Sequence, residues 1–208
     1  KFMNKGVLVI ISGFSGAGKG TIVKKLMERY PDEYVLSISA TTRNPRTGEE
    51  EGVDYFFKTK EEFEEMIRQD EFLEYAFFVD RYYGTPREFV LNNLNAGKNV
   101  ILEIDRQGAM KVQKKFPEVV MIFLTPPDAE ELKRRLMSRG TETMEVIEQR
   151  LEQAVEEAKF IDAYDYLLIN ETGKVDECVE NVHGVIQIEK MKTFRNQEKI
   201  RSIRNELQ

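Results

Sequence analysis

The sequence predicts an α/β fold in which a parallel sheet is covered by helices on both faces. Apolar runs of strand length recur along the chain, and helical patterns separate most of them. Nearly continuous apolar strands are typical of parallel sheets, because helices cover both faces of such a sheet. A glycine-rich segment follows the first apolar run and precedes a helix, which indicates a phosphate-binding loop. At 208 residues the chain is long enough for one domain with insertions.

The predicted elements alternate along most of the chain. The expected strands are Val7–Ile11, Val35–Ile38, Val100–Ile104, Val119–Leu124 and Tyr166–Ile169. The expected helices between them are Lys19–Tyr30, Gln107–Phe116, Ala129–Arg139 and Met144–Ala163. Such alternation predicts a P-loop type of parallel sheet flanked by helices.

The glycine-rich segment has the composition of a P-loop. Its residues are Gly13, Phe14, Ser15, Gly16, Ala17, Gly18, Lys19, Gly20 and Thr21. Glycines permit backbone conformations in which successive N–H groups converge on one anion, and the next helix adds its positive N-terminal end. Lys19 would bring a cation to the terminal phosphates. Gly20 stands where Ser or Thr usually reaches Mg²⁺, so Thr21 is expected to act on the metal through water.

The stretch from Ser39 to Ala96 interrupts the alternation and is interpreted as an inserted subdomain. It includes a β-like piece at Tyr55–Phe57 and a helix near Lys60–Gln69, which a capping box at Thr59 opens. The expected division is a core of 5–38, 97–127 and 151–190, an insert of 39–96, a lid of 128–150 and a C-terminal amphipathic helix of 190–208.

Composition excludes several kinds of site. The formal net charge of −6 disfavours nucleic acid as a partner, and no apolar run reaches the length of a membrane span. Cys178 and His183 are each the only residue of their type, so a histidine-centred triad and a Cys/His zinc site are excluded. A lone cysteine and the absence of a signal-peptide pattern near the start favour a reducing, cytoplasmic location. Phosphoryl transfer remains, because it depends on positioning and charge more than on histidine.

Short motifs in the insert and after it point to one family. They are Thr-Thr-Arg-x-x-Arg at 41–46, Asp-Tyr at 54–55, Glu-Tyr-Ala at 74–76, Tyr-Tyr-Gly at 82–84 and Arg-Gly-Thr-Glu at 139–142. Together with the P-loop they resemble the guanylate kinases, which transfer the γ-phosphate of ATP to GMP. The resemblance runs from the P-loop to Asn170. It implies ATP as donor, Mg²⁺ as cofactor, and GMP and dGMP as acceptors.

Two sets of residues suit the acceptor. Arg43 and Arg46 lie three apart in a hydroxyl-rich loop, and paired guanidinium groups suit a phosphate dianion. Glu74 lies among apolar residues, where a carboxylate would pair with the adjacent N1–H and N2–H₂ donors of guanine and repel adenine. On the residues alone, both arginines and the glutamate could instead be surface charges. The resemblance favours the binding role and adds further GMP contacts at Ser39, Tyr55, Tyr83, Gly84, Thr85, Glu103 and Asp105.

The resemblance also assigns roles around the phosphates. Glu103, where many relatives have Asp, would help to hold Lys19 and the hydrated Mg²⁺, and Asp105 would lie near the base or the metal. Arginines at positions 135, 139 and 150 would close as a lid, neutralise charge and exclude water. The alternative for that helix is an exposed surface of Glu–Arg pairs, which is expected for Glu130, Glu131 and Arg134. Asn170 would lie near the adenine of ATP.

Other interpretations stay open at this point. A kinase for a different monophosphate is the nearest, although Glu74 argues against AMP, and a GTPase is disfavoured because no Asn-Lys-x-Asp motif is present. A non-catalytic scaffold that binds phosphopeptides would have a degraded P-loop, whereas Gly13, Gly18 and Lys19 are intact. The basic tail Lys190–Gln208 is expected to pack on the body as a solvated helix, with an acidic partner as the alternative, in a monomer or a homodimer.

Overall fold

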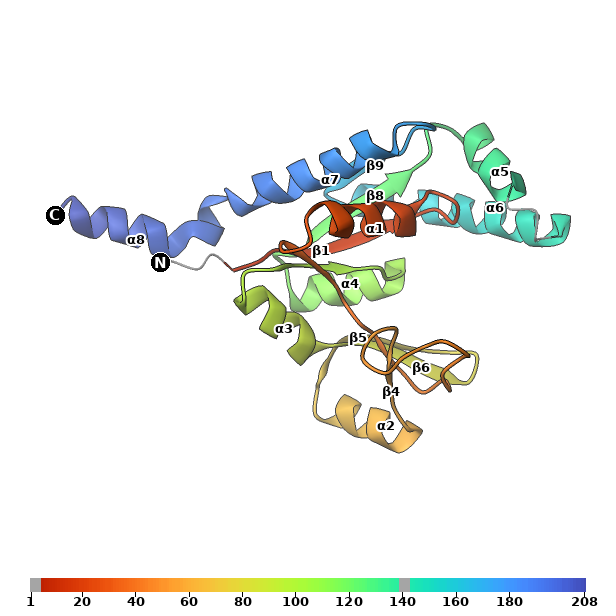
Figure 1. Ribbon diagram of the computed structural model, residues 1–208, viewed down its shortest axis with the longest axis horizontal. Helices are drawn as coiled ribbons and strands as arrows, with labels where there is room; N and C mark the ends of the chain where they lie inside the picture. The colour runs from red at the N-terminus through yellow and green to blue at the C-terminus, as the bar shows by residue number, and fades with distance from the viewer. Residues whose placement is uncertain (1–4, 139–142) are drawn as a thin grey trace.

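The computed structural model describes residues 5–138 and 143–208 and contains two sheets (Figure 1). The central sheet is parallel throughout, in the order β2-β7-β1-β8-β9. Its strands are β1 Leu8–Gly13, β2 Tyr34–Leu36, β7 Asn99–Leu102, β8 Val120–Thr125 and β9 Tyr166–Ile169. The predicted α/β class and all five predicted strands are therefore confirmed, with ends that differ by one or two residues.

Helices cover both faces of this sheet because successive residues of β1 point to opposite sides. Val9 and Ile11 face a cluster that includes residues of α1 (Lys19–Arg29), α5 (Ala129–Ser138), α6 (Met144–Ala158) and α7 (Val175–Lys190). Leu8 and Ile10 face a second cluster with residues of α3 (Arg87–Asn95) and α4 (Arg106–Lys115). These alternating apolar contacts fix the register of the central strand, at whose carboxyl end the P-loop begins.

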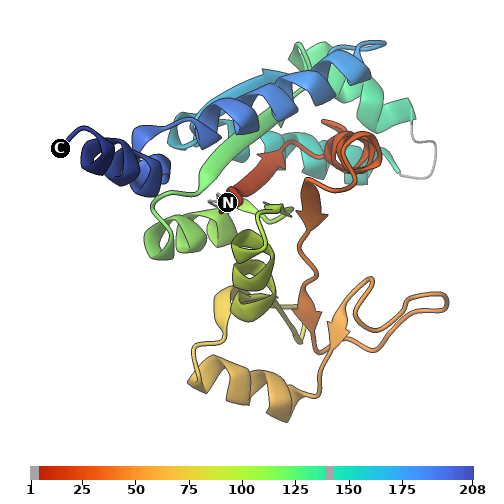
Figure 2. The ribbon, with the colours of Figure 1, turned by 60° about the vertical axis from the view of Figure 1, so that its left-hand side comes forward.

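A second, four-stranded sheet, in the order β4-β3-β6-β5, lies to one side of the central sheet (Figure 2), and Leu73 packs from it into the second core cluster. Its strands are β3 Ala40–Thr41, β4 Phe56–Phe57, β5 Phe72–Phe78 and β6 Arg81–Pro86. The helix α2 (Lys60–Arg68) packs on it through Phe63, whose ring stacks on Phe72 at 4.4 Å and on Tyr82 at 5.0 Å between ring centroids. The predicted capping box is present: Thr59 accepts from the backbone N–H of Glu62, whose carboxylate accepts from the N–H of Thr59.

Some predicted boundaries were wrong for identifiable reasons. The strand expected to reach Ile104 ends at Leu102, because Asp105 caps α4 and the chain leaves the sheet before it. The helix expected to reach Ala163 ends at Ala158, and a short 3₁₀ helix, Ile161–Ala163, follows it. The helix α3 was not expected, since its asparagines weaken the helical pattern, yet Val90 and Leu94 are buried against the core.

The C-terminal tail is not the continuous helix that was expected. The helix α7 ends at Lys190, a 3₁₀ helix spans Thr193–Asn196, and α8 covers Gln197–Glu206. At the break the side chain of Asn196 donates to the carbonyls of Lys190 and Lys192, which ends the first helix. In Figure 1 α8 extends away from the body at the left, and no residue of α8 is buried. None of the helices described is both long and apolar enough to cross a membrane.

A buried carboxylate lies just before this break. Glu189 is 2% exposed and accepts a hydrogen bond from the phenol of Tyr166 at 2.6 Å. Lys192 forms an ion pair with it at 2.7 Å, and Arg195 lies 3.9 Å away. Burial opposes ionisation of Glu189, but these contacts outweigh burial and lower the pKa of its carboxyl. The tail is therefore attached to the core by charge neutralisation as well as by packing.

Candidate active site

The P-loop is a tight turn between β1 and α1 in which glycine is required at several positions. Gly13 has φ +152°, and a Cβ there would lie 2.1 Å from the carbonyl oxygen of Leu124. Gly18, the residue before α1, has φ +89°, and a Cβ there would lie 2.6 Å from the side-chain nitrogen of Asn170. Both the backbone conformation and the close approach exclude larger residues. The loop thus packs directly against β8 and the segment after β9.

The lysine of the loop folds back over it. The Nζ of Lys19 donates to the carbonyl oxygens of Gly13 at 2.5 Å and Phe14 at 3.1 Å. Gly20 and Thr21 follow on the first turn of α1 and are exposed. The cation therefore lies at the N-terminal end of α1, where the helix dipole also favours an anion.

A cavity of about 330 Å³ opens beside the loop. Its lining brings together the P-loop and the segment after β7, namely Ser12, Gly13, Ser15, Lys19, Glu103, Ile104, Asp105 and Arg106, with Phe123, Gln153, Glu157 and Tyr164. Glu103 is exposed at the mouth of the cavity, yet surrounding protein atoms raise the pKa of its carboxyl, while the charge of Lys19 opposes that rise. A cation and a carboxylate thus face one space at the carboxyl ends of neighbouring strands, as expected for a nucleotide site.

A second cavity of about 180 Å³ continues toward the inserted sheet. It is lined by Leu36, Ser37, Ser39, Asp54, Tyr55, Thr85, Leu102, Glu103 and Ile104. Glu103 and Ile104 line both cavities, so the two spaces adjoin. Ser39, Tyr55 and Thr85, which the sequence assigned to the acceptor, all line the second one.

Glu74 and Thr85, which the sequence analysis assigned to the acceptor, form a buried pair on adjacent strands. They lie opposite each other in the β5–β6 register, and Thr85 Oγ1 donates to Glu74 Oε1 at 2.7 Å. Burial raises the pKa of Glu74, and the charge of Asp105 raises it further, while the Thr85 hydrogen bond and the charge of Lys111 lower it. A buried acceptor-only group of this kind gains most from a ligand that supplies N–H donors.

The N-terminal turn of α4 brings a second carboxylate close to Glu74. Asp105 Oδ1 accepts from the N–H of Gly108 at 2.8 Å and caps the helix. A Cβ on Gly108 would lie 3.1 Å from Glu74 Oε2 and 3.4 Å from Asp105 Oδ1. The small residue therefore lets both carboxylates approach the same turn.

The arginines and tyrosines of the insert that were predicted to bind the acceptor are only partly brought together. Arg43 lies over the ring of Tyr55 at 5.1 Å, and the rings of Tyr55 and Tyr83 meet edge to face at 6.4 Å. The guanidinium of Arg43 forms a bidentate ion pair with Glu49, which the sequence reasoning missed. Arg46 is exposed, and only its backbone N–H reaches the same carboxylate. Gly84 is buried on β6, where a Cβ would lie 2.9 Å from the ring of Phe72.

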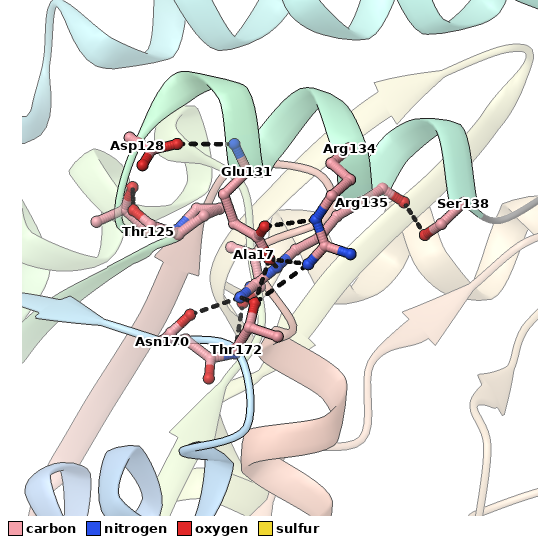
Figure 3. Close-up of polar contacts among 10 residues, drawn as sticks. Ala17, Thr125, Asp128, Glu131, Arg134, Arg135, Ser138, Asn170 and Thr172 are labelled. Atoms are coloured by element: carbon pink, nitrogen blue, oxygen red, sulfur yellow. Dashed lines mark hydrogen bonds and ion pairs between the residues drawn. The ribbon is translucent and has the colours of Figure 1, made fainter.

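The two described arginines of the three predicted for a lid differ in what they contact. Arg150 reaches from α6 to the P-loop, where its guanidinium donates to Ser15 Oγ at 2.5 Å. Arg135 instead lies on Glu131, with Nε donating to Oε1 at 2.7 Å, and donates to the carbonyl oxygen of Asn170 at 2.7 Å (Figure 3). Arg139 lies outside the described residues.

Glu131 has a larger role than the surface pair that was expected. It binds Arg134, as predicted, but it also binds Arg135 and accepts from the hydroxyl of Thr172 (Figure 3). Hydrogen bonds from Arg134, Thr172 and Arg135 lower the pKa of Glu131 to about 2. A signal was available in the i to i+3 and i to i+4 spacing of these charges, but the contribution of Thr172 from a distant loop was not visible.

Asn170 lies against the P-loop. It is 3% exposed, and its Nδ2 donates to the carbonyl oxygen of Ala17 at 2.9 Å. Its backbone joins β8 through the carbonyl of Thr125 at 2.8 Å. The residue therefore fixes the position of the loop relative to the end of the sheet.

Comparison with known proteins agrees with this geometry. The family model described as guanylate kinase matches residues 5–189. The chain is 52% identical over 202 residues to a guanylate kinase of Caldanaerobacter subterraneus subsp. tengcongensis, with 97% of each chain covered. It is 51% identical over 191 residues to that of Oceanobacillus iheyensis, covering 92% of this chain and 91% of the relative.

A solved structure is similar as well. The crystal structure of guanylate kinase from Anaplasma phagocytophilum superposes with a TM-score of 0.69 at 35% identity, covering 92% of this chain and 90% of that one. The P-loop, the adjoining cavities, the match over residues 5–189 and the identity of half the residues over nearly the full length agree, and the chain belongs to the guanylate kinase family.

Proposed function

We propose that this enzyme binds ATP at the P-loop and GMP in the cavity beside the inserted sheet. Transfer of the ATP γ-phosphate to GMP, giving ADP and GDP, is the reaction of its family. The observation that carries the assignment is the adjacency of the two cavities, which share Glu103 and Ile104. Lys19 borders one of them and Thr85 borders the other. Donor and acceptor phosphates would then meet near Glu103.

Guanine recognition is assigned to the buried carboxylate. Glu74, oriented by the hydroxyl of Thr85, would accept from N1–H and N2–H₂ of the base, with Asp105 close by. Adenine would present an acceptor to a buried acceptor, which a desolvated site penalises strongly. Ser39, which lines the same cavity as Thr85, would complete the base contacts, and Gly84 lets β6 pack closely against Phe72 and the backbone of Glu74. Because none of these contacts involves the ribose 2′-OH, dGMP should also be an acceptor.

The GMP phosphate is assigned to the arginine-tyrosine group of the insert. Arg43 lies beside Tyr55, and Tyr55 beside Tyr83, so a guanidinium and two phenols can converge on one dianion. Arg46 is exposed and would turn toward the phosphate only when GMP is bound. The phosphate would then face the P-loop cavity, since Tyr55 lines the cavity that adjoins it.

In the transfer step an oxygen of the GMP phosphate bonds to the γ-phosphorus. The bond from that phosphorus to the β–γ bridging oxygen breaks, and its electron pair leaves with ADP. The attacking oxygen is already anionic, so no general base is needed, and catalysis rests on alignment and charge neutralisation. Lys19 and Arg150 lie at the loop that would hold the phosphates, and we assign Arg135 and Arg139 to the closing lid.

Mg²⁺ is assigned as the cofactor. The carboxylate of Glu103 beside Lys19 suits a hard cation that keeps several waters and binds mainly through substrate phosphates. Glu103 and Thr21 would hold it through water, and when bound the ion would offset charge on the β- and γ-phosphates. Asn170, fixed against Ala17, would support the loop on the ATP side.

Several broader assignments follow the same proposal. The chain would divide into a core of 5–38, 97–127 and 151–190, a GMP-binding insert of 39–96 and a lid of 128–150, with α8 outside the site. We also propose a cytoplasmic location, which the single, buried Cys178 suits because it leaves no cysteine pair to oxidise.

The test is an ADP-release assay with ATP and Mg²⁺ and a panel of acceptors: GMP, dGMP, AMP, UMP, CMP and dTMP. Turnover is expected with GMP and dGMP, and Lys19→Ala should lower kcat by about 10³-fold because a charge-neutralising group is lost at the phosphates. Turnover with AMP or a pyrimidine monophosphate at a rate similar to GMP would overturn the assignment of Glu74. Absence of GMP-dependent turnover in the unmodified enzyme would overturn the whole proposal.

A further inference from the structure

The ion pair between Arg43 and Glu49 stands apart from the other charged contacts of the insert. Arg43 Nη1 donates to Glu49 Oε2 and Nη2 donates to Oε1, both at 2.9 Å, and the two side chains are only 16% and 20% exposed. Exposed ion pairs are weak, whereas a bidentate, half-buried pair fixes both partners. Hydrogen bonds from Arg43 and from the Arg46 N–H lower the pKa of Glu49 to about 2. The carboxylate therefore stays ionised at every pH at which the enzyme would work.

Glu49 also closes the loop that carries both arginines. Its Oε2 accepts from the backbone N–H of Arg46 at 2.7 Å, and its own N–H donates to the carbonyl oxygen of Arg46 at 3.0 Å. Gly48, at φ +89°, permits the turn between them. One carboxylate thus joins the guanidinium of Arg43 to the backbone of Arg46.

The geometry of the guanidinium shows which side remains for a ligand. The Nη1–Nη2 edge faces Glu49, and Nη1 also donates to the carbonyl oxygen of Asn44 at 2.9 Å. Within residues 5–138 and 143–208, the Nε edge forms no ion pair with an acidic side chain, and the neutral Tyr55 also interacts with Arg43. A guanidinium can donate to the oxygens of a separate anion on each of these two edges. Glu49 and a phosphate can therefore hold Arg43 at the same time.

We propose that Glu49 is a positioning residue that holds Arg43, and through it the loop 43–49, ready for the phosphate of the acceptor nucleotide. This inference rests on the assignment of Arg43 to the GMP phosphate. A free arginine side chain loses rotamer freedom when it is fixed, and the ion pair with Glu49 imposes that loss before GMP arrives. The negative charge of Glu49 opposes phosphate binding, but the bidentate ion pair with Arg43 neutralises that charge.

The test measures GMP affinity by calorimetry together with kcat and KM for both substrates. Glu49→Gln should weaken GMP binding about tenfold, the size expected when a hydrogen bond to a charged group is lost. The KM for ATP should not change, and kcat at saturating GMP should stay within about twofold, since the reacting groups are untouched. Glu49→Asp should restore part of the affinity, because a shorter carboxylate can still meet the guanidinium.

A matched control is available next to the site. Glu50 is exposed and, within the described residues, forms no ion pair with Arg43 or Arg46. Glu50→Gln removes the same charge from the same loop and should leave GMP affinity unchanged. Thermal unfolding of each variant shows whether the loop substitution has damaged the fold as a whole.

The decisive comparison is a double-mutant cycle with Arg43→Met. If Glu49 acts through Arg43, Glu49→Gln should weaken GMP binding by less than about twofold in the Arg43→Met background. Independent, multiplying effects would overturn the inference, and so would tighter GMP binding in Glu49→Gln, which would make the carboxylate a competing anion. If Arg43→Met alone leaves GMP affinity unchanged, the fault lies in the proposed phosphate site and not in Glu49.

Discussion

The proposed donor side and the proposed acceptor side of this site are built in different ways. The P-loop is one continuous turn between β1 and α1, and its shape depends on glycines packed against backbone and on a lysine folded over carbonyls. The acceptor side is assembled from side chains that β5, β6, the turn before α4 and the loop 43–49 bring together. Substitutions in the P-loop should therefore lower activity through backbone strain. Substitutions on the other side should lower it through the loss of individual polar partners.

The largest expected effect tests the backbone part of this comparison. Gly18→Ala would place a methyl group 2.6 Å from Asn170 at a residue with φ +89°, so the loop must shift. We expect kcat/KM to fall by at least about 10²-fold, because misplaced reacting groups are costly. The measurement is the steady-state ADP-release assay.

The same helix turn offers the control for that substitution. A Cβ on Gly20 would meet nothing within 4 Å, and Gly20 lies in α1 with ordinary helical backbone. Gly20→Ala should keep activity and raise the free energy of unfolding by about 0.5–1 kcal/mol. Equal loss of activity in both variants would mean that glycine content, and not the packing at Gly18, controls the loop.

The next effect tests the side-chain part. Glu74→Gln should lower kcat/KM for GMP by about 10²-fold, because the amide presents a donor where the base also has donors.

Burial and Asp105 raise the pKa of Glu74 in the folded protein, so its ionised form costs stability at neutral pH. A raised carboxyl pKa gives stability that is present at low pH and is lost as the pH rises through the folded pKa. Glu74→Gln should therefore raise Tm at pH 7, and the gain should shrink as the pH falls.

Thermal melts over a pH series check this sign. Glu61→Gln, which removes an exposed charge on α2, serves as the control and should show no such trend. A Glu74→Gln variant that is less stable than the parent at neutral pH would show that the buried carboxylate is already well compensated without ligand.

The smallest effect concerns Asn170, which supports the P-loop. Asn170→Ala removes the hydrogen bond to the carbonyl of Ala17 and leaves that buried group unsatisfied. The expected cost is about 1–3 kcal/mol in the free energy of unfolding and a rise of a few-fold in KM for ATP, with KM for GMP unchanged. Chemical denaturation and the two KM values measure it. An equal rise in both KM values would place Asn170 in lid closure rather than in the donor loop.

The same contrast explains what could be predicted from the sequence. The P-loop lies within one short segment, and the strands have continuous apolar runs, so order and composition alone predicted both. The acceptor residues were assigned from short motifs and a family resemblance, and the structure brings Glu74, Thr85 and Asp105 to one place. The partners of the arginines could not be predicted, because nothing in the sequence distinguishes Glu49 from the other acidic residues of its loop.

The boundaries of elements were predicted less well than their existence. The strand β7 ends at Leu102 because Asp105 caps α4. The sequence did not reveal that this side chain would bind the backbone of the next helix, so the strand was predicted two residues too long. The tail was interpreted as one helix because Asn196 gives no sign in the sequence that it will bind two carbonyls and end α7.

The buried carboxylate at the end of α7 has a consequence for where the folded unit ends. The family match stops at residue 189, and Glu189 is buried there with Lys192 and Arg195 as its cations. A shortened chain that kept only the matched residues would retain an anion in the interior and discard the groups that neutralise it. The start of the tail therefore supplies the positive charges that neutralise a carboxylate of the core. A shortened form of the enzyme should keep Lys192 and Arg195.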